Sequence, residues 1–301
     1  MKKTFSLLIA GIIAVLTFSC TDKEEIFKPQ NRLFKVWERS EVDKDNPNQE
    51  FIYNAKQINR IDSIYNYNPE TGARSHFVFE YSKDNTVNTI TLSDSVSTET
   101  IKLLYVSQQL TKVAYIIDGA PRIEFIFTRD MKTGKVKRIT QSFERLFFED
   151  LKRIKASDFY NFFLGFSDEV LEFAEKNASK AALELFCEID VVYTKDNISQ
   201  IKEVYYHPDD TEVIVTDFLY DDTFNPYYGL PFPYTNNKLT GYSRNNKSEA
   251  NITKTKKSNT TYQNIIYDNK YELNDNQYPK RIITGKGPEY VPVNTYFLYK
   301  E

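Results

Sequence analysis

The sequence predicts a mainly β protein, built as a large antiparallel meander with an α-helical insertion near residues 143–188. Composition is the first reason, because the 301 residues include 22 tyrosines and 22 phenylalanines but only 9 glycines, and aromatic residues favour strands. Alternation is the second. Apolar residues recur at every other position, as in Ile123, Phe125 and Phe127, which indicates strands with one buried and one solvated face.

Five segments repeat the same hairpin pattern. Residues 79–90 and 191–201 each contain an aromatic strand end, a polar Asp-Asn turn and a returning strand. Looser copies occupy residues 105–113, 127–139 and 271–282. Alternating apolar residues on both sides of an Asn, Asp or Gly turn are typical of β-hairpins. We therefore expect consecutive strands to pair.

The middle of the chain breaks this pattern. Between about residues 143 and 188 turn residues become sparse and apolar residues recur at helical spacing, with Ser167 as a candidate N-cap before Asp168 and Glu169. We predict an α-helical insertion here. An aromatic stripe within it would either close one side or end of the sheet or offer a face to a partner. The stripe includes Phe159, Phe162, Phe163 and Phe166.

A long polar stretch lies in the last third of the chain. Residues 235–263 are rich in Asn, Ser, Thr and Lys and contain Lys254-Thr255-Lys256-Lys257. This basic run is too short and isolated for a nucleic-acid contact. We predict a mobile hairpin or a solvated sheet edge instead.

Three motifs lie within that polar stretch or on either side of it. They are Tyr220-Asp221-Asp222-Thr223-Phe224-Asn225-Pro226, Tyr242-Ser243-Arg244-Asn245-Asn246 and Leu273-Asn274-Asp275-Asn276-Gln277-Tyr278-Pro279-Lys280-Arg281-Ile282. In this order they resemble a Bacteroidota family of surface lipoproteins of unknown function. The resemblance covers about residues 200–285. It implies a strongly curved or barrel-like (porin-like) β-sheet, and it implies no catalytic residues.

The N-terminus has the layout of a secretory signal peptide over residues 1–19. Two lysines precede an apolar run that is too short for a comfortable membrane span. The run ends in Leu16-Thr17-Phe18-Ser19-Cys20, which resembles a lipobox, whose cysteine receives diacylglycerol and is then acylated on its new amino group. We predict a lipoprotein held at a membrane through the lipid on Cys20. A plain signal peptide with a free cysteine is the alternative.

A short charged leader follows the predicted anchor. Residues 20–32 would form a tether, and residues 33–301 a single β domain. Lys23, Glu24 and Glu25 resemble the lysine-plus-two-acidics export signal of Bacteroidota lipoproteins. The resemblance implies a lipid-anchored protein of the outer membrane that faces the cell exterior, although a merely solvated tether would also be polar.

Charge and residue usage disfavour several functional classes. Removing residues 1–19 takes away two lysines and no acids, so the formal charge falls from -3 to -5, which disfavours nucleic acid as a partner. The chain has only His76 and His207, in separate hairpins, and no P-loop, zinc-binding or nucleophile motif. We predict that the protein is not an enzyme and binds no cofactor or metal.

Two further features have structural explanations. Cys187 lies in an apolar run and would be the one cysteine left in the folded part, so we predict a buried structural thiol. The densest acidic stretch matches no calcium-binding loop, and turns are favoured over a calcium site. It comprises Asp209, Asp210, Asp217, Asp221 and Asp222.

The strongest candidate for a recognition surface is the aromatic loop after Phe224. Tyr227, Tyr228, Phe232 and Tyr234 lie among three prolines, and tyrosine rings suit sugars or protein anchors. The alternative is that these rings pin the loop onto its own sheet.

Two short segments resemble the O-glycosylation site of exported Bacteroidota proteins. They are Asp62-Ser63-Ile64 and Asp94-Ser95-Val96. Such short matches also arise by chance. Ser63 and Ser95 are therefore candidate glycosylation sites.

Three functions remain open. The first is a non-catalytic surface lipoprotein that binds a glycan or a protein, and the second is an envelope carrier or structural module that holds a lipidic ligand against a curved sheet. An enzyme of unrecognised type is the third. An exposed aromatic platform would favour the first, a continuous apolar groove the second, and converging carboxylates the third.

Overall fold

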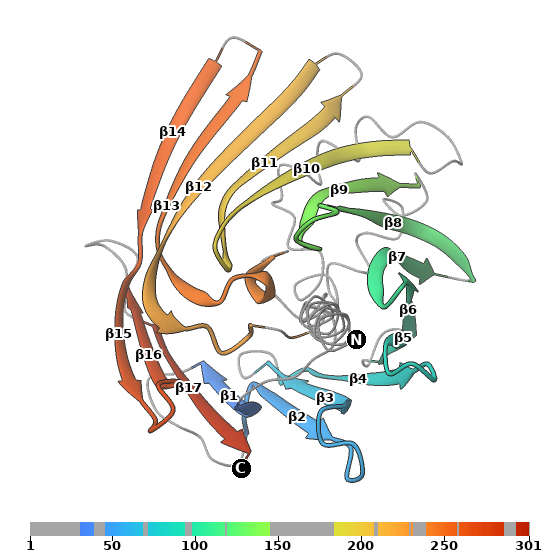
Figure 1. Ribbon diagram of the computed structural model, residues 1–301, viewed down its shortest axis with the longest axis vertical. Helices are drawn as coiled ribbons and strands as arrows, with labels where there is room; N and C mark the ends of the chain where they lie inside the picture. Colours follow the sequence, from blue (N-terminus) through green and yellow to red (C-terminus); the bar gives the residue numbers. More distant parts are fainter. Residues whose placement is uncertain are drawn as a thin grey trace, which may run out of the picture.

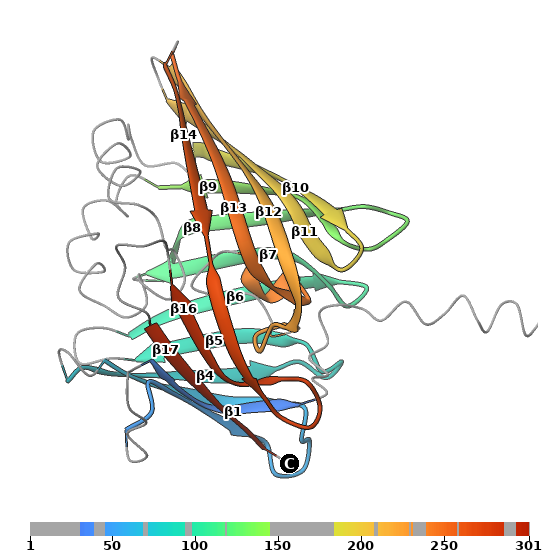
Figure 2. The ribbon, with the colours of Figure 1, turned by 90° about the vertical axis from the view of Figure 1, so that its left-hand side faces the viewer.

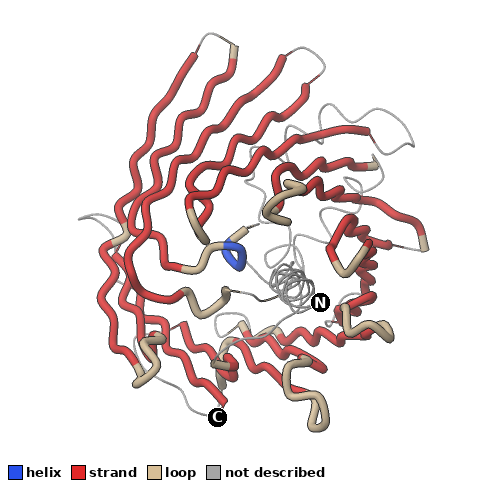
Figure 3. Tube along the Cα trace, in the orientation of Figure 1, coloured by secondary structure: helices blue, strands red, loops and turns tan. Residues whose placement is uncertain are grey.

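The structure, a computed structural model, describes residues 31–38, 46–68, 72–93, 98–117, 119–144, 184–207, 210–228, 230, 239–257, 259–285 and 293–300. These residues form one antiparallel sheet of 17 strands, curved into a nearly closed barrel (Figures 1 and 3). The mainly β, barrel-like fold is therefore confirmed. The strands are β1 (Arg32–Glu38), β2 (Gln49–Tyr53), β3 (Ile61–Tyr67), β4 (Arg74–Tyr81), β5 (Val87–Ser93), β6 (Thr98–Val106), β7 (Gln109–Ile117), β8 (Ala120–Arg129), β9 (Val136–Phe143), β10 (Glu184–Thr194), β11 (Asn197–His207), β12 (Asp210–Phe224), β13 (Asn245–Lys256), β14 (Asn259–Ile266), β15 (Asp268–Leu273), β16 (Pro279–Gly285) and β17 (Val293–Lys300).

Strands that follow one another along the chain pair side by side, and β17 returns to pair with β1. The pairing also continues from β9 to β10, where Ile139 lies opposite Ile189. The step from β14 to β15 differs, because β14 pairs with β13 and β15 pairs with β16. Between β14 and β15, Tyr267 donates its N–H to the carbonyl of Ser248 at 2.9 Å. This bond continues the backbone hydrogen bonding to β13 across the junction of the two strands.

The helical insertion is corrected at both of its predicted ends. Phe143 ends β9, and residues 184–188 belong to β10. The C-terminal end of the predicted insertion forms a strand instead of a helix, because Cys187 and Ile189 alternate with polar residues and pair with β9. The rest of the predicted insertion, residues 145–183, lies outside the described residues.

Helix is scarce in the part of the chain that the structure describes. One helical turn occurs there, the 3-10 helix η2 (Thr240–Tyr242). No helix of these residues is long and apolar enough to cross a membrane.

All five predicted hairpins are confirmed, at the turns after β4, β6, β8, β10 and β15. Several of these turns place a residue at positive φ, as tight turns require: Asn85 (75°), Gly134 (74°), Lys195 (54°) and Gln277 (65°). Connections in a meander alternate between its two ends. The five turns therefore share one end of the barrel, which we call the turn end (right-hand side of Figure 2).

The two faces of the sheet differ in polarity. On β8, Ile123, Phe125 and Phe127 are at most 4% exposed, whereas the intervening Ile126 is 46% exposed. The buried residues face the inside of the barrel and form one core on β1–β11, β16 and β17, against which partly buried residues of β12 and β15 pack. Members of this core from successive strands include Val36, Phe51, Ile64, Phe77, Ile90, Ile101, Val113, Ile123, Ile139, Ile189, Ile198, Ile282 and Phe297.

Charged pairs occupy the outer face. Lys35 forms an ion pair with Glu50 at 3.2 Å, and Arg138 forms one with Asp190 at 2.6 Å. Each of these residues alternates with an inward apolar neighbour on its strand. The outer face also exposes apolar side chains, among them Leu104, Ile126 and Leu219.

The hairpin of β13 and β14 projects beyond the rest of the ring together with β12 (Figures 1 and 2). β14 is almost wholly exposed, and Tyr262 on it is 80% exposed. No described strand pairs with its second edge over residues 259–266. The solvated edge predicted within residues 235–263 is therefore found at β14, whereas Leu239 and Ser243 of the same stretch are buried.

Candidate functional site

The three sequence motifs of the last third meet at the turn end. Asn225 donates its backbone N–H to the carbonyl of Arg244 at 2.8 Å. The third motif joins them through Tyr278, whose ring stacks on that of Phe224 with centroids 5.0 Å apart. The Arg244 guanidinium lies 5.0 Å from the centroid of the Phe224 ring, a favourable cation–π contact. These contacts hold the two ends of segment 225–244, and its helical turn lies inside the ring (Figure 3).

Ser243 is the buried centre of this arrangement, with 2% of the residue exposed. Its hydroxyl accepts the N–H of Ile198 at 3.1 Å and lies 2.9 Å from the hydroxyl of Tyr220. Its carbonyl accepts a hydrogen bond from the side-chain amide of Asn225 at 3.0 Å. Because buried polar groups need partners, these bonds fix the returning chain to β11 and β12.

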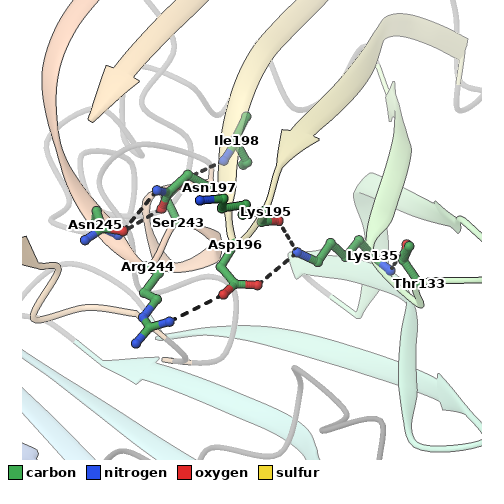
Figure 4. Close-up of polar contacts among 9 residues, drawn as sticks. All are labelled: Thr133, Lys135, Lys195, Asp196, Asn197, Ile198, Ser243, Arg244 and Asn245. Carbon is green, nitrogen blue, oxygen red and sulfur yellow. Dashed lines mark hydrogen bonds and ion pairs between the residues drawn. The ribbon is translucent and has the colours of Figure 1, made fainter. Parts of the chain in front are cut away.

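Asp196, in the turn after β10, connects three segments (Figure 4). Its carboxylate lies 3.3 Å from Nζ of Lys135 and 3.6 Å from Nη1 of Arg244, and its carbonyl accepts the Arg244 N–H at 3.1 Å. Next to it the side chains of Asn197 and Asn245 hydrogen-bond at 3.0 Å. Exposed ion pairs contribute little singly. Together these bonds hold segment 225–244 across the turn end.

Segment 225–244 directs apolar side chains inward. Tyr227 contacts Phe297 edge-on, with ring centroids 6.1 Å apart, and burial raises the pKa of its hydroxyl. Leu230 and Leu239 are 5% and 4% exposed and belong to the barrel core. The described residues of segment 225–244 thus plug the turn end, and we call this segment the plug.

The plug contains the four aromatic residues predicted to bind a partner. Tyr227 contacts the core and Tyr228 is partly buried, whereas Phe232 and Tyr234 lie outside the described residues. Tyr227 fits the alternative in which these rings pin the loop onto its own sheet. The described part of the plug therefore presents no exposed pair of adjacent rings.

The inner face of the barrel is the larger candidate for a binding surface. About eight strands make a barrel that side chains can fill, whereas roughly 16 to 18 leave a channel. A ring of 17 strands is wider than one that its own side chains would fill, and the plug supplies part of what lies inside it. The apolar residues of the inner face are themselves almost fully buried, so this face suits apolar contents.

Polar side chains interrupt this lining at a few places. Gln141 and Glu99 are 1% and 3% exposed. Gln141 lies on β9 between Phe125 and Cys187 of the neighbouring strands. Its Oε1 atom accepts no hydrogen bond from the residues that the structure describes. Such an atom is available to a polar group inside the barrel.

Lys247 adds a positive charge to the inner face. Its Nζ atom lies 4.4 Å from the centroid of the Phe218 ring, which packs against the core. Desolvation lowers the pKa of Lys247 to about 8. Sequence reasoning misses this residue, because the polar segment around it predicts a mobile hairpin or a solvated sheet edge. A β-bulge in the pairing of β12 with β13 directs Lys247 inward.

The described residues contain no group of three or more His, Cys, Asp or Glu that could hold a metal ion. His76 stacks on Tyr65 with centroids 4.2 Å apart, and partial burial lowers its pKa. Asp221 accepts a hydrogen bond from the hydroxyl of Tyr271. His207 ends β11, far along the ring from β4, which carries His76.

The remaining predicted residues divide into three groups. Cys187 is a free, fully buried thiol, as expected. Ser63 lies within β3 and is 9% exposed, so its hydroxyl is poorly placed for a glycan once the chain has folded. Ser95, Cys20 and residues 23–25 lie outside the described residues, and their predicted modification and export roles stay predictions.

Comparisons with known proteins find similarity to solved structures but not to sequences. No protein-family model matches the chain, and no curated protein sequence matches it. Among solved structures the chain is similar to a porin-like protein from Bacteroides uniformis, with 9% sequence identity and a TM-score of 0.46. The match covers 92% of this chain and 100% of that chain. Membership of the Bacteroidota lipoprotein family therefore stays a prediction.

Proposed function

We propose that this chain is a non-catalytic envelope lipoprotein that holds an apolar or amphipathic ligand inside its barrel. One observation carries the proposal: the inner face is apolar over most of the ring, while the outer face carries charged pairs. Apolar surface gains about 25 cal/mol for each square ångström that is removed from water. A lipid chain would therefore be held by that face.

The cellular setting rests on the N-terminal sequence. A signal peptide over residues 1–19 and lipid on Cys20 would tether the barrel to the outer membrane, and Lys23, Glu24 and Glu25 would direct it to the cell exterior. An outer face that carries charged pairs suits a barrel that stands beside a membrane on a tether. In that position it would store or transfer a membrane-derived ligand.

The lipid-carrier reading is favoured over the glycan- or protein-binding one. Glycan or protein recognition by the aromatic loop would need adjacent exposed rings, and Tyr227 instead contacts the core. The apolar lining, by contrast, extends over many strands of the ring. The ligand we propose is therefore lipidic.

The test places a tryptophan reporter on either face. Phe79 is 7% exposed on the inner side and Tyr65 is 48% exposed, so Phe79→Trp and Tyr65→Trp form a matched pair. Both are made with Trp37→Phe, which removes the single native tryptophan. A neutral long-chain alcohol with bromine on its chain is then added to each variant, and fluorescence is recorded.

We expect the ligand to quench the fluorescence of Phe79→Trp at concentrations that leave the fluorescence of Tyr65→Trp unchanged. The reason is that bromine quenches only at short range. Circular dichroism confirms that both variants fold. Equal quenching of the two, or none in either, would refute a ligand held inside the barrel.

A further inference from the structure

Lys247 faces the inside of the barrel because of a β-bulge. In the pairing of β12 with β13, Phe218 lies opposite Ala250, and an unbroken ladder would place Ser248 opposite Tyr220. The register shifts there, and Lys247 takes that position. Bulges commonly re-aim a side chain in this way. The bulge coincides with the β14–β15 junction, where Tyr267 bonds to the carbonyl of Ser248.

The ammonium group of Lys247 has no anionic partner in the described part of the chain. Its contact there is the ring of Phe218, and Asn269 bonds to its backbone carbonyl rather than to its side chain. A partly buried cation without a counter-charge is costly. An aromatic ring offsets only part of that cost.

The neighbouring polar groups are already engaged. On β12, Tyr220 bonds to Ser243, and burial raises its pKa to about 12. Asp221 accepts the hydroxyl of Tyr271 from β15. Glu249, on β13 itself, accepts hydrogen bonds from two asparagine side chains. The ammonium therefore lies among apolar and satisfied groups, where an anion brought by a ligand would be its first counter-ion.

We propose that Lys247 binds the anionic head group of the ligand, and that the ligand is a single-chain lipid with an oxyanion head, a carboxylate or a phosphate. The head would lie at Lys247 near the bulge, and the chain would extend along the apolar lining beyond Phe218. This assignment rests on the proposed function, because it names the ligand class of the same inner face.

The experiment compares four probes on the unmodified mature protein: dodecanoate, dodecyl phosphate, dodecanol and acetate. Affinities are measured by displacement of a neutral naphthylamine dye at pH 7. Dodecanoate or dodecyl phosphate should bind at least about tenfold more tightly than dodecanol, and the stronger of the two identifies the head group. Acetate should not compete, since it lacks the chain.

Three variants locate the effect. Lys247→Met should remove the preference for the charged probe and leave dodecanol binding unchanged, whereas Lys102→Met, at an exposed position of β6, should behave like the wild type. In the wild type the affinity for the charged probe should fall as pH rises above about 8, where Lys247 loses its proton. Lys247→Arg should keep the preference and lose this pH dependence, because arginine stays charged.

The outcomes separate the two proposals. Equal binding of dodecanoate, dodecyl phosphate and dodecanol by the wild type, or an unchanged preference in Lys247→Met, would overturn the role of Lys247 and leave the lipid-carrier function standing. Binding of none of the three would refute both. Should Lys247→Met fail to fold, the pH profiles of the wild type and of Lys247→Arg still decide.

Discussion

Two leucines on adjacent strands show how position governs the contribution of a residue to this fold. Leu92 on β5 is 0% exposed, and Leu104 on β6 is 57% exposed. Leu92→Ala would leave a cavity in the core and should lower the free energy of unfolding by about 3 kcal/mol. Leu104→Ala should change it by less than about 0.5 kcal/mol. Urea unfolding measures both, and equal losses would contradict the assignment of the inner face.

Sequence reasoning succeeded at Cys187 and failed at Lys247 for physical reasons. Cys187 has apolar neighbours in the sequence, which indicate a buried side chain whichever face of the strand it lies on. Lys247 follows two asparagines in a polar stretch, and its direction depends on one shift of register. A bulge of this kind depends on the partner strand, so the local pattern does not signal it.

At the scale of elements, the plug is held by Ser243 more than by the exposed ion pairs around Asp196. Ser243→Ala would leave the buried N–H of Ile198 and the hydroxyl of Tyr220 without this partner. We expect a loss of about 1–3 kcal/mol in unfolding free energy, together with faster hydrogen exchange at Ile198. Ser199→Ala is the control, because that hydroxyl makes a single exposed hydrogen bond at 3.3 Å. Equal effects of the two changes would show that Ser243 does not hold the plug.

The elements that the sequence predicted best are the hairpins. Their turns contain residues such as Asn85 and Gly134, whose positive φ is a local requirement that composition reveals. The predicted helical insertion is wrong at its C-terminal end, at Leu185 and Cys187. Apolar residues there fit both helical and strand spacing, and pairing with β9 decides between the two.

At the scale of the whole molecule, we propose that the leader decides where the barrel is displayed. Replacing Lys23, Glu24 and Glu25 with alanine should turn a protein that protease can reach on intact cells into a protected one. Cys20→Ala should move it from the membrane fraction to the soluble fraction, because the lipid is lost. Unchanged accessibility in the triple variant would show that these residues are not the export signal.

The sequence by itself determined the β class, the hairpin order, the buried thiol and the solvated edge at β14, because each depends on neighbours within a few residues of the chain. Only the tertiary structure decided that β17 closes on β1, that β9 pairs with β10 across 40 residues, and that the plug turns inward. These features depend on which distant strands meet and in which register. The apolar lumen with Lys247 inside it exists only once that ring has formed.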